Sequence, residues 1–124
     1  GTLLTDIYQC AQNGGGALVA AFPDKISPAT CQLLIDFMAQ DKLGSLLQGG
    51  VPDGTLVPHK HGYVPAPDGV IHDISDVGIV YTPGGNFVLA VYTYHPINNL
   101  WDITNPLVGD LTKSVYNYFN ITIQ

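Results

Sequence analysis

Residues 74–94 read ISDVGIVY, then TPGGN, then FVLAVYTY. The two apolar runs are rich in β-branched and aromatic residues, and the linking residues contain one proline and two glycines, which is typical of a hairpin loop. So short a connection implies that the two runs pair in antiparallel fashion. The stretch therefore predicts one strand over residues 74–81 and another over residues 87–94, around which the rest of the fold is arranged.

Helical periodicity dominates the residues far upstream of this hairpin. Apolar side chains at positions 3, 4, 7, 8 and 11 predict a helix over residues 1–12. Ser27 and Pro28 predict the start of another helix, since serine caps helices and proline is tolerated in their first turn. A short apolar stretch, residues 17–22, lies between the two. We assign residues 1–50 to a helical segment.

Residues 51–124 complete the pattern. A strand is expected over residues 55–63, after a Pro-Asp-Gly turn, and a final helix over residues 99–120. In that helix apolar residues recur every four positions and, with Val108 alongside, predict the buried face: Leu107, Leu111, Val115 and Phe119. The predicted fold class is α+β, with helices followed by a three-stranded antiparallel meander and a C-terminal helix.

The strand at residues 87–94 raises a question about its neighbours. Its sequence shows little polar alternation, as expected for a strand buried on both faces, yet a meander leaves it at the sheet edge. The helix over residues 1–12 also lacks a capping residue ahead of its apolar stripe. We therefore expect a larger sheet, in which a missing N-terminal segment or a second copy of the chain pairs with the 87–94 strand.

Composition excludes several classes of function. The 124 residues carry a net charge of −6, and the ten acids are all Asp and the four bases all Lys. A chain this acidic is not expected to bind nucleic acid, which requires a basic face. No apolar run is long enough for a membrane span. Cys10 and Cys31 are too few for a disulfide scaffold, and two buried thiols are the simpler expectation, with a bridge between helices as the alternative.

The most unusual local sequence is PHKHGY at residues 58–63. Lys60 stands in the middle of a predicted strand, where a solvated surface lysine is the simplest interpretation. Gly62 favours a site instead, because a glycine in a strand often marks a close approach by a ligand or another backbone. Lys60 and Gly62 are therefore candidate functional residues.

The order of these features resembles the C-terminal half of a class A serine β-lactamase or a close penicillin-recognising relative. In that family a lysine–threonine/serine–glycine strand precedes two apolar hairpin strands and a terminal helix. Here Lys60-His61-Gly62 precedes DVGIVYTPGG at residues 76–85 and FVLAV at residues 87–91. The resemblance covers essentially all 124 residues and implies that they form the C-terminal portion of a β-lactamase/transpeptidase-like domain.

The resemblance also implies roles for the candidate residues. Lys60 would place positive charge beside the substrate carboxylate, and Gly62 would let the ligand lie against the strand. The backbone N–H of Tyr63 would be one donor of the oxyanion hole. His61 replaces the threonine or serine whose hydroxyl binds the substrate carboxylate, and the arginine that often assists from the next strand is absent.

Other parts of the family's machinery are missing from this sequence. It contains no S-x-x-K motif, no serine–aspartate–asparagine triplet and no glutamate. The resemblance places these elements upstream, so the chain alone is expected to be inactive. It further implies a β-lactam or peptidoglycan-like substrate, a link to antibiotic resistance, no cofactor, and a secreted, periplasmic or cell-surface location in a bacterium.

Two alternatives remain at this stage. His59 and His61 form an H-x-H pair on one strand face that could hold a metal, with His72 and Asp73 on the next segment to complete the site. The second alternative is a non-catalytic penicillin-binding-like module that uses only the lysine strand.

Overall fold

The computed structural model describes residues 1–121. Its elements, in chain order, are α1 (Thr2–Asn13), α2 (Ala17–Ala21), α3 (Pro28–Met38), the 3-10 turn η1 (Gln48–Gly50), β1 (His59–Pro65), β2 (Ile71–Val80), β3 (Phe87–Tyr94) and α4 (Trp101–Phe119). This order confirms the predicted α+β class. All the helical elements except α4 lie within the first 50 residues.

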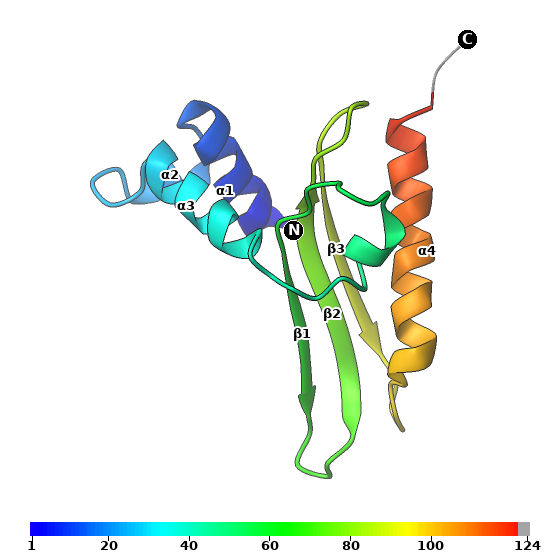
Figure 1. The fold of residues 1–124 in the computed structure, drawn as a ribbon. Coiled ribbons are helices and arrows are strands. Elements are labelled where there is room, and N and C mark those ends of the chain that lie inside the picture. Colours follow the sequence, from blue (N-terminus) through cyan, green and yellow to red (C-terminus); the bar gives the residue numbers. More distant parts are fainter. Residues whose placement is uncertain (122–124) are drawn as a thin grey trace.

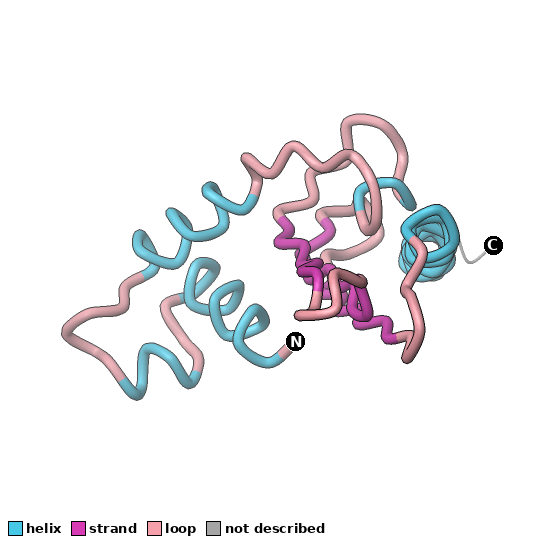
Figure 2. The backbone as a smooth tube through the Cα atoms, turned by 90° about the horizontal axis from the view of Figure 1, so that it is seen from below, coloured by secondary structure: helices cyan, strands magenta, loops and turns pink. Residues whose placement is uncertain are grey.

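The sheet is antiparallel with the strand order β1-β2-β3, and helices cover both of its faces. Helix α1 packs on one face with α3 beside it, whereas α4 packs along the other. Figure 1 shows the three N-terminal helices grouped apart from α4, and Figure 2 shows the strands between these two layers. Each face of the sheet thus has its own apolar core.

Alternation along the strands divides the core residues between the two faces. Toward α4, Ile74 and Val80 of β2 pack with Leu46, Leu47 and Val108. On the opposite face, Ile79 of β2 packs with Leu4 and Ile35 of the N-terminal helices. Because both faces are covered, β2 is the most deeply buried strand.

Strand β1 begins later than the sequence predicts, at His59 rather than at residue 55. Pro58 has no N–H and cannot donate to a ladder, although its carbonyl accepts a hydrogen bond from the Ile79 N–H at 2.9 Å. Strand β2 begins earlier than predicted, at Ile71. The β3 bounds match the prediction.

The predicted buried face of the last helix is right only in part, because Val108, Val115 and Phe119 pack against the core but Leu107 and Leu111 do not. Leu107 and Leu111 are 61% and 45% exposed, and the fully buried residues are Thr104, Val108 and Thr112. The reason is a close approach to η1: a Cβ on Gly50 would collide with the backbone of α4 and with Thr112. Small and β-branched side chains fit that contact better than leucine does.

Cys10 and Cys31 form a disulfide that joins α1 to α3, with their Cα atoms 6.0 Å apart. The simpler expectation of two free buried thiols is therefore wrong. The two half-cystines are fully buried between the helices, at 0% and 1% exposure. The bridge fixes α1 against α3 in the layer that covers one face of the sheet.

Strand β3 forms one edge of the described sheet and pairs only with β2. The expectation that it is buried on both faces holds only in part, because Phe87 is buried but Tyr92 and Tyr94 are largely exposed. Across residues 1–121, no helix has both the length and the apolar character needed to cross a membrane.

Candidate active site wall on strand β1

The four candidate residues lie together on β1, the other edge of the described sheet. Register pairs Lys60 with Val77 and Gly62 with Ser75, which places both on the face covered by α1. His59, His61 and Tyr63 alternate with them and point to the α4 face, where Tyr63 packs edge-on against Trp101 at 5.5 Å between ring centroids.

The same register determines in which direction the backbone N–H and C=O groups of β1 point. The bond from Ile79 N–H to Pro58 O makes these two residues a hydrogen-bonded pair of the ladder. Since such pairs alternate in an antiparallel sheet, His61 and Tyr63 occupy non-hydrogen-bonded positions opposite Asp76 and Ile74. The N–H of Tyr63 and the carbonyl of His61 therefore point away from β2, toward the outer edge of β1.

Lys60 is exposed, and its Nζ donates to the carbonyl oxygen of His61 at 2.7 Å. This bond folds the ammonium group around the strand edge, so that the cation and the Tyr63 N–H lie along the same side of β1. A hollow of about 330 Å³ adjoins Lys60 and is lined by the end of α3, the loop that follows it and β1: Phe37, Met38, Gln40, Asp41, His59 and Lys60.

His59 is buried and paired with Asp76 of β2. Its Nδ1 lies 3.0 and 2.9 Å from the two carboxylate oxygens, and the N–H of Leu47 donates to the same carboxylate at 3.1 Å. Burial disfavours the charged imidazole, but the hydrogen bond and the charge of Asp76 outweigh it and raise the pKa of His59. Gly78, opposite His59, makes room for the ring, since a Cβ there would lie 2.8 Å from the Cβ of His59.

His61 is paired with Asp41, which lies in the loop after α3. Nδ1 of the ring is 2.8 Å from Oδ2 of Asp41, and the N–H of Leu43 donates to Oδ1 of the same carboxylate at 2.9 Å. Partial burial works against ionisation of Asp41, but the Leu43 N–H and the imidazoles of His59 and His61 outweigh it and lower the pKa of Asp41. The ring of His61 also stacks on Tyr63, with 5.8 Å between centroids.

A comparison with known families shows to which family the chain belongs. The sequence profile of the β-lactamase enzyme family matches residues 17–119, which include the whole sheet and α4. The chain belongs to the β-lactamase enzyme family. Among curated relatives it is similar to β-lactamase VEB-1 of Pseudomonas aeruginosa, with 26% identity over 73 residues, which are 59% of this chain and 24% of that protein.

Solved structures agree with this family and indicate its class A branch. The chain is similar to TLA-3 extended-spectrum β-lactamase, with a TM-score of 0.65 and 29% identity over 82% of this chain and 38% of that one. An L158E mutant of PBP-A, solved as an acyl-enzyme complex with penicillin G, shares the fold at a TM-score of 0.69 and 24% identity, over 95% and 37% of the two chains. The chain thus spans between a quarter and two fifths of the lengths of these relatives.

Asp41 and Asp76 are the residues of the candidate site that the sequence did not reveal. Each binds a histidine of the PHKHGY motif from far away in the sequence. Asp41 lies 20 residues from its partner His61, and Asp76 lies 17 residues from its partner His59. No local spacing pattern signals such contacts, because they depend on the ladder register and on the path of the loop between α3 and η1.

The metal alternative gains no support from the described residues. His59 and His61 each direct Nδ1 to a different aspartate, and His72 bonds instead to Asp68 and to the His95 carbonyl. Within residues 1–121, no cluster of three or more His, Cys or carboxylate side chains is arranged to hold a metal ion.

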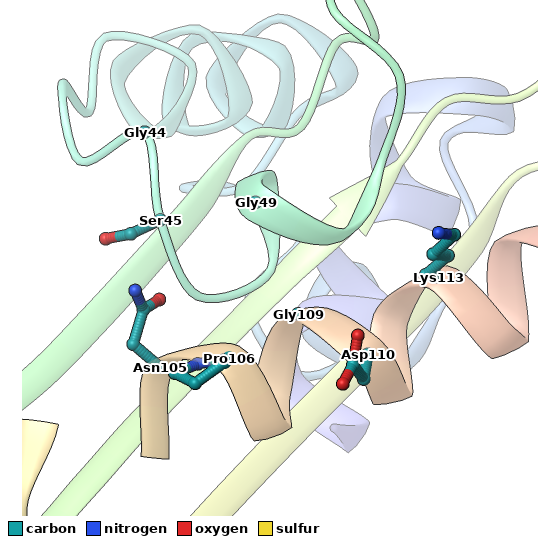
Figure 3. Close-up of a pocket in the computed structure, with 8 residues that line it drawn as sticks. All are labelled: Gly44, Ser45, Gly49, Asn105, Pro106, Gly109, Asp110 and Lys113. Carbon is teal, nitrogen blue, oxygen red and sulfur yellow. The ribbon is translucent and has the colours of Figure 1, made fainter. Parts of the chain in front are cut away.

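A second hollow lies on the far side of the loop, against α4. It measures about 310 Å³ and is lined by glycines and by polar groups of the loop and the helix (Figure 3): Gly44, Ser45, Gly49, Asn105, Pro106, Gly109, Asp110 and Lys113. None of the β1 candidates borders it. Asn105, which lines this hollow, accepts a hydrogen bond at Oδ1 from the N–H of Leu46 at 2.8 Å, and this bond anchors the loop to α4.

Proposed function

We propose that this chain supplies the Lys-x-Gly wall of a serine β-lactamase-type active site. The single observation that carries the proposal is the common orientation along the outer edge of β1, where the Lys60 ammonium group and the outward N–H of Tyr63 lie on one side. A ligand placed against this edge would meet a cation and a backbone donor, with no side chain at Gly62 in the way.

The proposed reaction opens a β-lactam ring through an acyl-serine intermediate. A serine hydroxyl attacks the lactam carbonyl, the C–N bond breaks, and the nitrogen takes a proton, leaving an ester that water then hydrolyses. The Tyr63 N–H stabilises the oxyanion formed during attack, a donor of a type commonly worth about 3 kcal/mol. Lys60 neutralises the substrate carboxylate, and His61 in its cationic form donates to that carboxylate.

The nucleophile must come from residues outside this sequence, which has no S-x-x-K motif. We propose that the chain alone does not hydrolyse β-lactams and that a strand absent from it pairs with the outer edge of β3. An oxidising compartment outside the cytoplasm fits the Cys10–Cys31 bridge, since such bonds persist there. A bacterial envelope or secreted location is accordingly part of the proposal.

The test is acylation and turnover by the full-length protein. We expect labelling by a fluorescent penicillin and hydrolysis of nitrocefin. Lys60→Ala should slow acylation by about 100-fold or more, and Lys25→Ala, which removes an exposed lysine far from β1, should leave the rate unchanged. Absence of both labelling and turnover would refute the enzymatic proposal, and equal rates for the two variants would remove Lys60 from the site.

A second candidate is a penicillin-binding protein that acylates but deacylates slowly. It is favoured by the replacement of a hydroxyl residue by His61 and by the fold shared with PBP-A. The same experiment separates the two candidates. Stoichiometric labelling without sustained nitrocefin hydrolysis supports the binding protein, whereas repeated turnover supports the hydrolase.

A further inference from the structure

Asp41 and His61 form a hydrogen-bonded pair beside the proposed site wall, with 2.8 Å between Oδ2 and Nδ1. The pair links the loop after α3 to the outer strand, and both side chains are mostly shielded, at 13% and 24% exposure. Asp41 is itself fixed, because its other oxygen accepts the Leu43 N–H. The carboxylate is therefore held in place by its own loop before it meets the ring.

The contact determines which ring nitrogen carries hydrogen. Asp41 is ionised, as its lowered pKa indicates, and an ionised carboxylate can only accept, so Nδ1 of His61 must be the donor. Nε2 remains for a ligand: the described residues give it no hydrogen-bond partner, and it is not among the buried atoms lacking one. A neutral ring presents a lone pair at Nε2, whereas a cationic ring presents an N–H.

Among the charged and titratable groups near His61, Asp41 is the one that is hydrogen-bonded to its ring. On β1, His59 lies 6.4 Å away between ring centroids, Tyr63 stacks on the ring, and Lys60 bonds the His61 carbonyl. On β2, Asp76 faces His61 in the register, but its carboxylate is taken by His59 and the Leu47 N–H. Lys42 follows Asp41 in the loop, and Trp101 of α4 packs edge-on against Tyr63, the neighbour on which the His61 ring stacks.

We propose that Asp41 is a positioning residue that makes His61 a protonation-dependent anchor for the carboxylate of an anionic substrate. The cationic ring donates Nε2–H to that carboxylate, and the neutral ring, held by Asp41 with its lone pair outward, repels it. The proposal rests on the proposed function of this strand. A serine or threonine hydroxyl at this position would donate at every pH, so the His61–Asp41 pair adds a dependence on pH to substrate selection.

The experiment compares a β-lactam bearing a free carboxylate with its methyl ester, in the full-length protein. Both share the acylation chemistry, so the ratio of their second-order acylation constants isolates carboxylate recognition. We expect this ratio to fall about tenfold or more between about pH 5 and about pH 8. In His61→Thr the ratio should become independent of pH.

Asp41→Asn tests the positioning role. The fall in the ratio should become shallower, because a neutral ring no longer held with its hydrogen on Nδ1 can donate from Nε2, and the change should appear in binding of the anionic substrate rather than in the rate of the bound complex. Asp36→Asn is the matched control, since Asp36 is an exposed α3 aspartate bonded to Gln32. A pH-independent ratio in the unaltered protein, or the same pH dependence in His61→Thr, overturns the inference.

Nitrogen-15 NMR of the His61 ring gives an answer that does not require turnover. The ring should be protonated at Nδ1 when neutral, this preference should weaken in Asp41→Asn, and benzoate, a simple carboxylate probe, should shift the titration of the ring to higher pH. If no β-lactam acylates the protein but benzoate shifts the ring, the proposed function fails and the anchor stands. If the neutral ring is protonated at Nε2, or benzoate has no effect, the anchor is refuted.

Discussion

His59 and Asp76 form a buried pair across the β1–β2 ladder, with Nδ1 of the histidine 2.9 Å from the nearer carboxylate oxygen and neither residue more than 2% exposed. Leu47 adds a backbone donor from the loop between α3 and η1. One carboxylate thus connects two strands and the loop, and its partner His59 directly precedes Lys60 in the sequence. The geometry of the candidate site depends on this contact.

Removal of Asp76 should destabilise the protein strongly. In Asp76→Ala the buried imidazole and the Leu47 N–H lose their acceptor, and we expect the free energy of unfolding to fall by about 3 kcal/mol. Urea unfolding of the full-length protein measures this. Asp73→Ala, an exposed aspartate on the same strand, is the control and should cost less than about 0.5 kcal/mol. Equal losses would show that the buried pair contributes nothing specific.

The pH dependence of stability should carry the signature of His59. Its pKa is raised in the folded protein, so its contribution is complete below the unfolded value of 6.5 and is lost as pH rises through the folded value. We expect stability to decrease with rising pH above neutrality, and His59→Gln to flatten this slope. His72, whose pKa is raised by Asp68 at an exposed site, contributes weakly, and His72→Gln serves as the control. An unchanged slope in His59→Gln would contradict the prediction.

Local patterns in the sequence predicted much of the fold. The Ser27–Pro28 helix start is observed, with the Ser27 hydroxyl accepting from the Thr30 N–H, and so is the hairpin around residues 82–86. Both depend on residues close together in the chain. The candidate residues of β1 also lie side by side because they belong to one strand.

Long-range contacts account for what the sequence did not predict. The burial of Thr112 in place of Leu111 depends on how closely η1 approaches α4, and the roles of Asp41 and Asp76 depend on the loop path. Hydrophobic periodicity in α4 fitted two overlapping faces, and only the partner element selects between them. The Cys10–Cys31 bridge likewise follows from the packing of α1 on α3, which spacing alone does not reveal.

Gly50 should be intolerant of any side chain. A Cβ at this position would overlap the carbonyl oxygen of Gly109 and the side chain of Thr112, so Gly50→Ala must push η1 away from α4. We expect a loss of about 2 kcal/mol in unfolding free energy, typical of overpacking. Gly44→Ala is the matched control, because a Cβ there would meet no atom within 4 Å apart from those of its chain neighbours. Thermal unfolding of the two variants should differ clearly, and similar melting temperatures would show that α4 is not held by this contact.

Reduction of the Cys10–Cys31 bridge should weaken the layer formed by α1 and α3. The bond joins residues 21 positions apart, and closing a loop of this size is worth about 3 kcal/mol through restriction of the unfolded chain. The double variant Cys10→Ala/Cys31→Ala should therefore unfold at lower urea concentration than the oxidised protein. It should also be insensitive to dithiothreitol, whereas the unaltered protein should shift toward the variant on reduction.

The end of α3 leads directly to Asp41, so this variant should in addition expose the α3 amides to faster hydrogen exchange than those of β2. Uniform exchange in both elements would instead place the effect of the bridge on the whole domain, and an unchanged urea midpoint would contradict the stabilising role.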